Sequence, residues 1–172
     1  VQEFVRPTRL SLLPMHIAGI RQNSVNYVSL TPGTSFDPKS REGRVEERAL
    51  IHYLLKGKLN ASPAGLRRLL QCRVSDDNWR WWTNKWKPES LDGDVSKAFV
   101  RTVVSDKDFH QRITDFCARS KRRVLRNDPE RLELVAELRF RIAEMSVEML
   151  EPDLIILDEF QRFKNLLDHN NP

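Results

Sequence analysis

The stretch LIILDE, residues 154–159, decides the predicted fold, because it places four consecutive apolar residues directly before two acids. Such a run is typical of a strand that is buried on both faces of a parallel sheet. A second candidate strand is NYVSL, residues 26–30, where bulky residues alternate before the turn TPGT at 31–34. Two strands of this kind predict an α/β architecture.

The segment between the two strands has helical periodicity. Its longest helix is expected to begin at Asp128-Pro129 and to end before Pro152, with an apolar stripe that belongs to the core. Shorter helices have the same pattern, and they are expected at 44–56, 62–70, 94–103 and 105–117. A parallel crossover needs only about 12 to 30 residues. The excess length predicts a large helical insertion in an α/β sheet.

These elements suggest a division of the chain into three parts. Residues 1–40 hold the first strand and its Thr-Pro-Gly turn, 41–151 form the helical insertion, and 152–172 hold the last strand and the helix that follows it. The predicted fold class is therefore α/β, although the chain is expected to be predominantly helical overall.

The composition is that of a soluble globular protein, with 40% hydrophobic and 31% charged residues in a chain of 172. No run of about 18 apolar residues is present, and the first residues do not form a secretion signal. We therefore expect an intracellular protein with no membrane partner. The cysteines and histidines lack metal-ligand spacing, which gives little support to a structural metal site.

Positive charge is concentrated between Lys107 and Arg126. This run has seven Lys or Arg and two Asp, so it accounts for the whole net charge of +5, and its densest part is Lys121-Arg122-Arg123. Basic side chains of this kind can neutralise nucleic-acid phosphates and release counterions. They can equally form a solvated helix end, where cations complement the helix dipole. The sequence favours neither interpretation.

All four tryptophans lie in NWRWWTNKWK, residues 78–87, among three basic residues. Trp79, Trp82 and Trp86 are spaced so that they share one helical face, which favours packing against the core. Trp81 falls on another face beside Arg80, and an exposed aromatic ring next to a cation can stack an unpaired base. We therefore predict that Trp81 and Arg80 contact nucleic acid.

Asp158 and Glu159 stand at the C-terminal end of the expected strand, which is where open α/β sheets place their ligands. The first carboxylate could hold Mg²⁺ beside nucleotide phosphates, and the second could orient or deprotonate the attacking water. The alternative is a strand that simply ends in a solvated turn.

The run DEFQRFKN, residues 158–165, resembles motif II of superfamily 2 helicases, and most of all that of the Swi/Snf-type remodellers. That branch has Asp-Glu-x-His or Asp-Glu-x-Gln, then Arg, a hydrophobic residue, Lys and Asn. The resemblance implies that Asp158 coordinates Mg²⁺, that Glu159 is the catalytic base, and that Gln161 couples the nucleotide state to the motor. The remaining motif residues, with an implied coupling role, are Arg162, Lys164 and Asn165.

The turn TPGT similarly resembles motif Ib of the same family, which implies that Thr31, Gly33 and Thr34 touch the nucleic-acid backbone. The order of the two motifs along the chain agrees with the family. The resemblance implies a partial RecA-like lobe of parallel strands, interrupted by the helical insertion. It also implies ATP and Mg²⁺ as cofactors, and DNA or RNA and the remaining motor lobes of the same polypeptide as partners.

One departure from the family is important. The sequence has no GxxxxGK[ST] loop, whose backbone amides and lysine hold nucleotide phosphates, and its single Gly-Lys pair, Gly57-Lys58, lacks the rest of the motif. We therefore expect this chain to be an interior piece of the first motor lobe of a longer, cytoplasmic polypeptide of bacterial type.

Two other functions are open at this stage. The chain could be a helical module that binds nucleic acid or protein without catalysis, through Trp81, Arg80 and the basic run 107–126. A metal-dependent nuclease is a weaker alternative, because the two adjacent acids lack a separated Asp/Glu-x-Lys partner.

Overall fold

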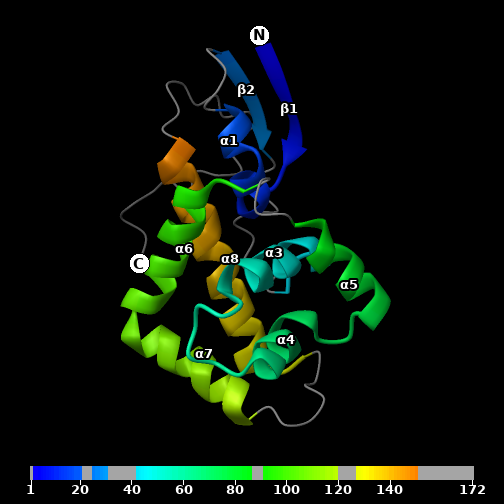
Figure 1. The fold of residues 1–172 in the computed structure, drawn as a ribbon, viewed down its shortest axis with the longest axis vertical. Helices are drawn as coiled ribbons and strands as arrows, with labels where there is room; N and C mark the ends of the chain where they lie inside the picture. Colours follow the sequence, from blue (N-terminus) through cyan, green and yellow to red (C-terminus); the bar gives the residue numbers. More distant parts are fainter. Residues whose placement is uncertain (1, 21–24, 31–41, 87–90, 120–126, 151–172) are drawn as a thin grey trace, which may run out of the picture.

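The computed structural model describes residues 2–20, 25–30, 42–86, 91–119 and 127–150 (Figure 1). A short N-terminal part consists of strand β1, the 3-10 helix η1, helix α1 and strand β2. It is followed by the helices α3 to α8, which we call the helical body. The elements are β1 (Gln2–Thr8), η1 (Leu10–Met15), α1 (Ile17–Ile20), β2 (Val25–Leu30), α3 (Val45–Leu55), α4 (Pro63–Gln71), α5 (Asp76–Lys85), α6 (Gly93–Ser105), α7 (Lys107–Arg119) and α8 (Pro129–Leu150).

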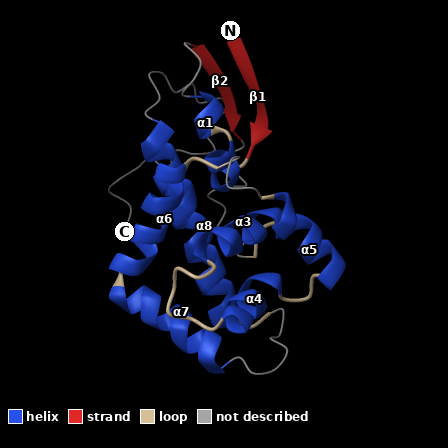
Figure 2. Ribbon diagram, in the orientation of Figure 1, coloured by secondary structure: helices blue, strands red, loops and turns tan. Residues whose placement is uncertain are grey.

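The prediction of an α/β fold with a RecA-like parallel sheet is wrong for the described residues, which form an essentially helical protein. Their strands amount to one parallel pair, β1 and β2, at one end of the molecule (Figure 2). The apolar residues recur mostly at helical spacing, so the helices bury them against one another instead of against a sheet. The other expected core strand, at 154–157, lies outside the described residues.

The strand expected at 26–30 corresponds to β2. Its partner β1 was not predicted, because its sequence includes charged residues and Pro7. The two strands pair in register from Gln2 opposite Val25 to Val5 opposite Val28, and the register then shifts before Thr8 pairs with Leu30. Pro7 lies within this shift, as expected of a residue with no backbone N–H to donate to a ladder.

The expected helices are present, with caps that explain where they begin. The Ser62 hydroxyl accepts a hydrogen bond from the Gly65 N–H at the start of α4, where Pro63 occupies the first turn. Carboxylates serve the same purpose on three other helices. They are Asp92 on α6, Asp106 on α7 and Asp128 on α8.

Helix α8 is the centre of the helical body and contacts η1, α3, α4, α6 and α7. Its stripe of apolar residues is fully buried at Leu134, Leu138 and Ile142, so the prediction that the stripe belongs to the core is confirmed. At its C-terminal end the helix returns to the end of the molecule where the strand pair lies (Figure 1). The chain thus leaves the body beside the N-terminal part.

Two helices approach each other closely at Gly65 of α4. A Cβ atom at this position would lie 2.2 Å from the carbonyl oxygen of Cys117 on α7, a distance that no real Cβ contact shows. Glycine is therefore needed here because α4 and α7 meet backbone to backbone.

A buried carboxylate joins three elements of the fold. Glu47 of α3 has no exposed surface, and its Oε1 accepts hydrogen bonds from Arg139 of α8 and from the Ser11 hydroxyl of η1. Its Oε2 accepts from Arg9 at 3.1 Å and from the Arg44 N–H at 2.6 Å, which caps α3. These donors satisfy both oxygens of a carboxylate that would be costly to bury without partners.

A second ionic group ties α8 to the C-terminal end of α4. Arg131, fully buried, donates to the Leu69 carbonyl and pairs with Glu42 at 3.2 Å. Arg48 donates to the carbonyls of Leu70 and Gln71 and pairs with Glu42 at 3.4 Å. Burial lowers the pKa of the Arg48 guanidinium, and Glu42 opposes that shift. The two arginines satisfy carbonyls that a helix end leaves unpaired.

We predict that replacement of Glu47 by alanine destabilises the fold by about 3 to 5 kcal/mol, because it removes the buried carboxylate that pairs with Arg9 and with the buried Arg139. The matched control is Glu46→Ala, whose carboxylate makes a more exposed ion pair with Lys85 and is expected to cost less than about 1 kcal/mol. Urea unfolding followed by circular dichroism measures both. Equal decreases in the free energy of unfolding of the two variants would show that the buried carboxylate of Glu47 stabilises the fold no more than the more exposed one of Glu46.

Candidate nucleic-acid interface at the α4–α5 corner

Of the predicted site residues, Arg80 and Trp81 lie in the part of the chain that the structure describes. The others lie outside it, and they are Thr31, Gly33, Thr34, Lys121, Arg122, Arg123, Asp158, Glu159, Gln161, Arg162, Lys164 and Asn165. Helix α5 and the turn that precedes it therefore provide the geometry of the candidate site.

Three of the tryptophans pack against the core, as their spacing predicts. Trp79 and Trp86 are buried and Trp82 is partly buried. The Trp79 ring meets the ring of His52 on α3 edge to face, with centroids 5.5 Å apart. Burial of these rings docks α5 on α3.

Trp81 points away from the core, also as expected, and 60% of its surface is exposed. Its ring meets that of Trp82 edge to face, with centroids 4.5 Å apart. The Lys85 Nζ lies 4.7 Å from the Trp82 centroid and 5.7 Å from that of Trp81, and it pairs with Glu46 at 3.4 Å. These contacts hold an exposed indole beside a cation.

A surface pocket lies where α4 ends and α5 begins. Cys72, at the turn, adopts a positive φ of 53°, which carries the chain away from α4. We call this pocket, with its three arginines, the arginine pocket. It is lined by Ala64, Arg67, Arg68, Gln71, Cys72, Arg73, Val74, Ser75 and Asp76.

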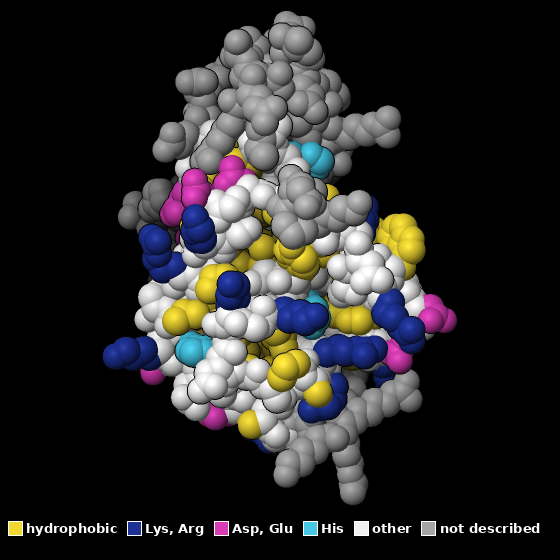
Figure 3. Space-filling view, viewed as in Figure 1, with side chains coloured by type: hydrophobic (Ala, Val, Ile, Leu, Met, Phe, Trp, Pro, Cys, Tyr) yellow, Lys and Arg dark blue, Asp and Glu magenta, His cyan; other side chains and the backbone are white. Residues whose placement is uncertain are grey.

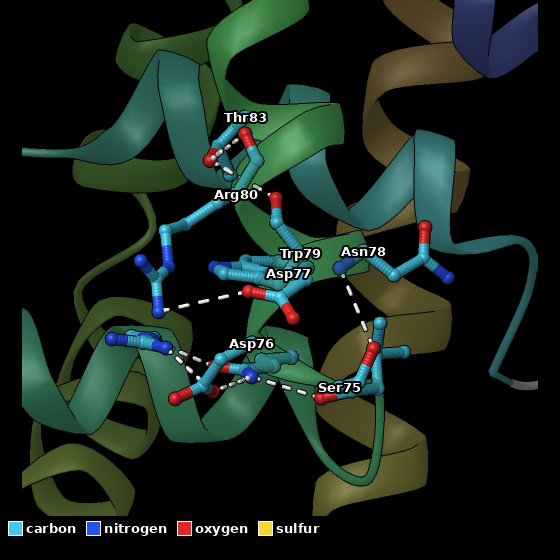
Figure 4. Close-up of polar contacts among 10 residues, drawn as sticks. Ser75, Asp76, Asp77, Asn78, Trp79, Arg80 and Thr83 are labelled. Atoms are coloured by element: carbon cyan, nitrogen blue, oxygen red, sulfur yellow. Dashed lines mark hydrogen bonds and ion pairs between the residues drawn. The ribbon is translucent and has the colours of Figure 1, made fainter.

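One wall of the arginine pocket is a hydrogen-bonded network (Figure 4). Arg67 donates to the Gln71 side chain at 2.6 Å and to Asp76 at 2.8 Å, and Gln71 donates to the same Asp76 oxygen at 2.7 Å. The hydrogen bond from Gln71 and the charge of Arg67 lower the pKa of Asp76, so it is ionised at neutral pH. The network fixes Arg67 on the surface.

Arg80 extends the positive surface from the pocket along α5. Its guanidinium lies 3.9 Å from the Asp77 carboxylate, and it is close enough to Asp76 to help lower the pKa of that carboxyl (Figure 4). Both side chains of the Arg80–Asp77 pair are largely exposed. An ion pair of this kind is weak in water and leaves Arg80 available to another anion.

The other two arginines of the pocket have no ion pair with another described residue. Arg68 is half-buried, and its Nε is buried without a hydrogen-bond partner in the described part of the chain. Arg73 is exposed. Figure 3 shows Lys and Arg side chains gathered over α4 and α5 on this face of the molecule.

Sequence reasoning missed the arginine pocket because it followed the densest basic run. The signal was present as the adjacent pair Arg67 and Arg68 and as Arg73, which follows them by six and five positions and joins them in one pocket only when the chain turns at Cys72.

Other kinds of site have little support among the residues described. No group of three or more His, Cys, Asp or Glu side chains there could hold a metal ion. No described helix is long and apolar enough to cross a membrane. Both cysteines are free, and burial raises the pKa of Cys117 to about 11, so that thiol stays protonated at neutral pH.

Comparison of the chain with protein-family models, with curated proteins and with solved structures finds no match.

The docking of α5 is expected to depend on pH through His52. Burial, and then the charges of Lys56 and Arg67, lower the pKa of this histidine from 6.5 to about 4. Between these values the unfolded chain binds a proton that the folded protein does not, so stability falls as the pH drops from 6.5 towards 4.

We predict that wild-type protein loses up to about 3 kcal/mol more over this range than His52→Phe, which keeps an aromatic ring against Trp79 but does not titrate. Urea unfolding at pH 7, 5.5 and 4.5 measures the difference, and contributions from other groups cancel between the two proteins. Parallel pH profiles would contradict a half-buried His52 that stays neutral down to about pH 4.

Proposed function

We propose that this chain is part of a nucleic-acid-dependent ATPase of the helicase type. The observation that carries the proposal is the run DEFQRFKN at 158–165, which follows four apolar residues and matches motif II at each defined position. In this proposal Asp158 holds Mg²⁺ and Glu159 activates the attacking water. The other motif II residues couple hydrolysis to movement along DNA or RNA.

The chain by itself is not expected to hydrolyse ATP. It has no GxxxxGK[ST] loop to hold the phosphates. Activity in this proposal depends on a polypeptide that also supplies this loop and a second motor lobe, which are the remaining partners of the site.

We predict that Glu159→Gln, in the polypeptide that contains the phosphate-binding loop, lowers kcat for ATP hydrolysis by at least about 100-fold, because the amide cannot accept a proton from water. ATP binding is retained, since the amide is similar in size and Asp158 is intact. The matched control is Glu144→Gln, an exposed position on α8, which leaves hydrolysis unchanged.

Hydrolysis by Glu159→Gln at the wild-type rate, with nucleic acid present, would refute the catalytic assignment. Phosphate release measured at saturating ATP gives kcat, and equilibrium titration with a fluorescent ATP analogue reports binding. The two measurements separate a lost base from a lost nucleotide site.

A second candidate function is binding without catalysis by the helical body. The exposed Trp81, held beside Lys85 and next to Arg80, favours nucleic acid as the partner, since aromatic rings interleaved with cations stack unpaired bases. The two candidates differ in one measurable property. Nucleic acid stimulates ATP hydrolysis under the first proposal, and it has no such effect under the second.

A further inference from the structure

The arginine pocket carries more positive charge than the fold neutralises. Arg67, Arg68 and Arg73 line it together with a single acid, Asp76, which leaves two positive charges unbalanced. Asp76 already accepts hydrogen bonds from Arg67 and Gln71, so its charge is balanced by Arg67 in the wall of the pocket. The charge in excess belongs to Arg68 and Arg73.

The unpartnered donor in this pocket belongs to Arg68. Its Nε is buried without a hydrogen bond to any described residue, and a buried charged donor without an acceptor is costly. The donors that face the pocket are other N–H groups of its lining arginines, Arg68 and Arg73, which have no ion pair with a described residue. Arginine suits a phosphate oxygen particularly well, because its planar N–H groups match the spacing of two oxygens.

An exposed aromatic ring lies on α5, the helix whose first residue lines the pocket. Asp76 lines the pocket at the start of α5, and Trp81 follows five residues later, about 7.5 Å further along the helix axis. Arg80, exposed between them, adds a third available cation. The corner therefore presents a positively charged pocket, and α5 carries an exposed indole about 1.4 helical turns from the pocket residue Asp76.

We propose that the α4–α5 corner binds single-stranded nucleic acid, with a backbone phosphate in the arginine pocket and an unpaired base stacked on Trp81. The base must be unpaired, because a base inside a duplex has both faces covered by its neighbours. Arg80, which directly precedes Trp81 on α5, contacts a second phosphate of the same strand. The inference rests on the nucleic-acid dependence of the proposed function, but it concerns binding by the helical body and needs no ATP.

The first test uses this 172-residue chain and a fluorescein-labelled oligothymidylate, with binding followed by anisotropy at several salt concentrations. Arg68→Ala combined with Arg73→Ala is expected to weaken binding about 10-fold, and to reduce the slope of log K against log salt by about 0.7. The control combines Lys58→Ala with Arg101→Ala, which removes two exposed cations outside the pocket. It is expected to change affinity less than 2-fold.

Trp81→Ala is expected to weaken oligothymidylate binding about 10-fold as well, and to leave the weaker binding of a blunt duplex unchanged. Circular dichroism spectra verify that each variant is folded. Equal affinity of the wild type for single strand and duplex, together with no effect of Trp81→Ala, would overturn the proposal. So would loss of binding on reversal of Lys121, Arg122 and Arg123 with no effect of the pocket variant.

Cys72 gives an independent readout, because it lines the pocket and is half-buried whereas Cys117 is buried. Saturating oligothymidylate is expected to slow alkylation of Cys72 by iodoacetamide several-fold. An unchanged rate would exclude the pocket as the phosphate site. Equal protection by inorganic phosphate alone, combined with no effect of Trp81→Ala, would mean a simple anion site and would overturn the nucleic-acid assignment.

This inference and the ATPase proposal can fail separately. A wild-type chain that binds no oligonucleotide overturns the inference and leaves the Glu159→Gln result as it stands. Hydrolysis that is unaffected by Glu159→Gln overturns the catalytic assignment, while the effects of Trp81 and the arginine pocket on strand binding are measured without ATP.

Discussion

The arrangement of the helical body depends on the buried carboxylate of Glu47. It is the point at which η1, the start of α3 and the middle of α8 meet, through Ser11, Arg9, Arg139 and the Arg44 N–H. Apolar packing alone allows helices to slide or rotate against one another at little cost. A single acid surrounded by donors from three elements permits one register, because any other leaves a buried charge unpaired.

The helices could be predicted from the sequence because their signals are local. Asp128 and Pro129 begin α8, and its apolar stripe at Leu134, Leu138 and Ile142 follows the helical period, so the element and its buried face are both determined within one segment. The same is true of α5, where spacing separated the buried Trp79 from the exposed Trp81.

The fold class and most of the candidate site could not be obtained in this way. An apolar run such as 154–157 fits a buried strand or a buried helix equally well. The α/β interpretation assigned it to a larger parallel sheet, and the described residues form only a two-stranded one. The arginine pocket depends on how the chain turns at Cys72, which has a positive φ. No glycine or other turn residue stands at this position to predict the turn from the sequence. Charge density along the sequence instead drew attention to Lys121–Arg123. Convergence in space was the information that the sequence lacked.

The capping of α4 from inside has an effect on the opposite, solvent side of that helix. The C-terminal end of a helix carries a partial negative charge, and the arginine pocket lies at such an end. Arg131 and Arg48 occupy the carbonyls of Leu69, Leu70 and Gln71 from the core side, so these dipoles are already neutralised. An incoming phosphate would therefore meet the outer arginines without repulsion from the backbone. Two buried arginines thus influence the electrostatic potential of the surface above them.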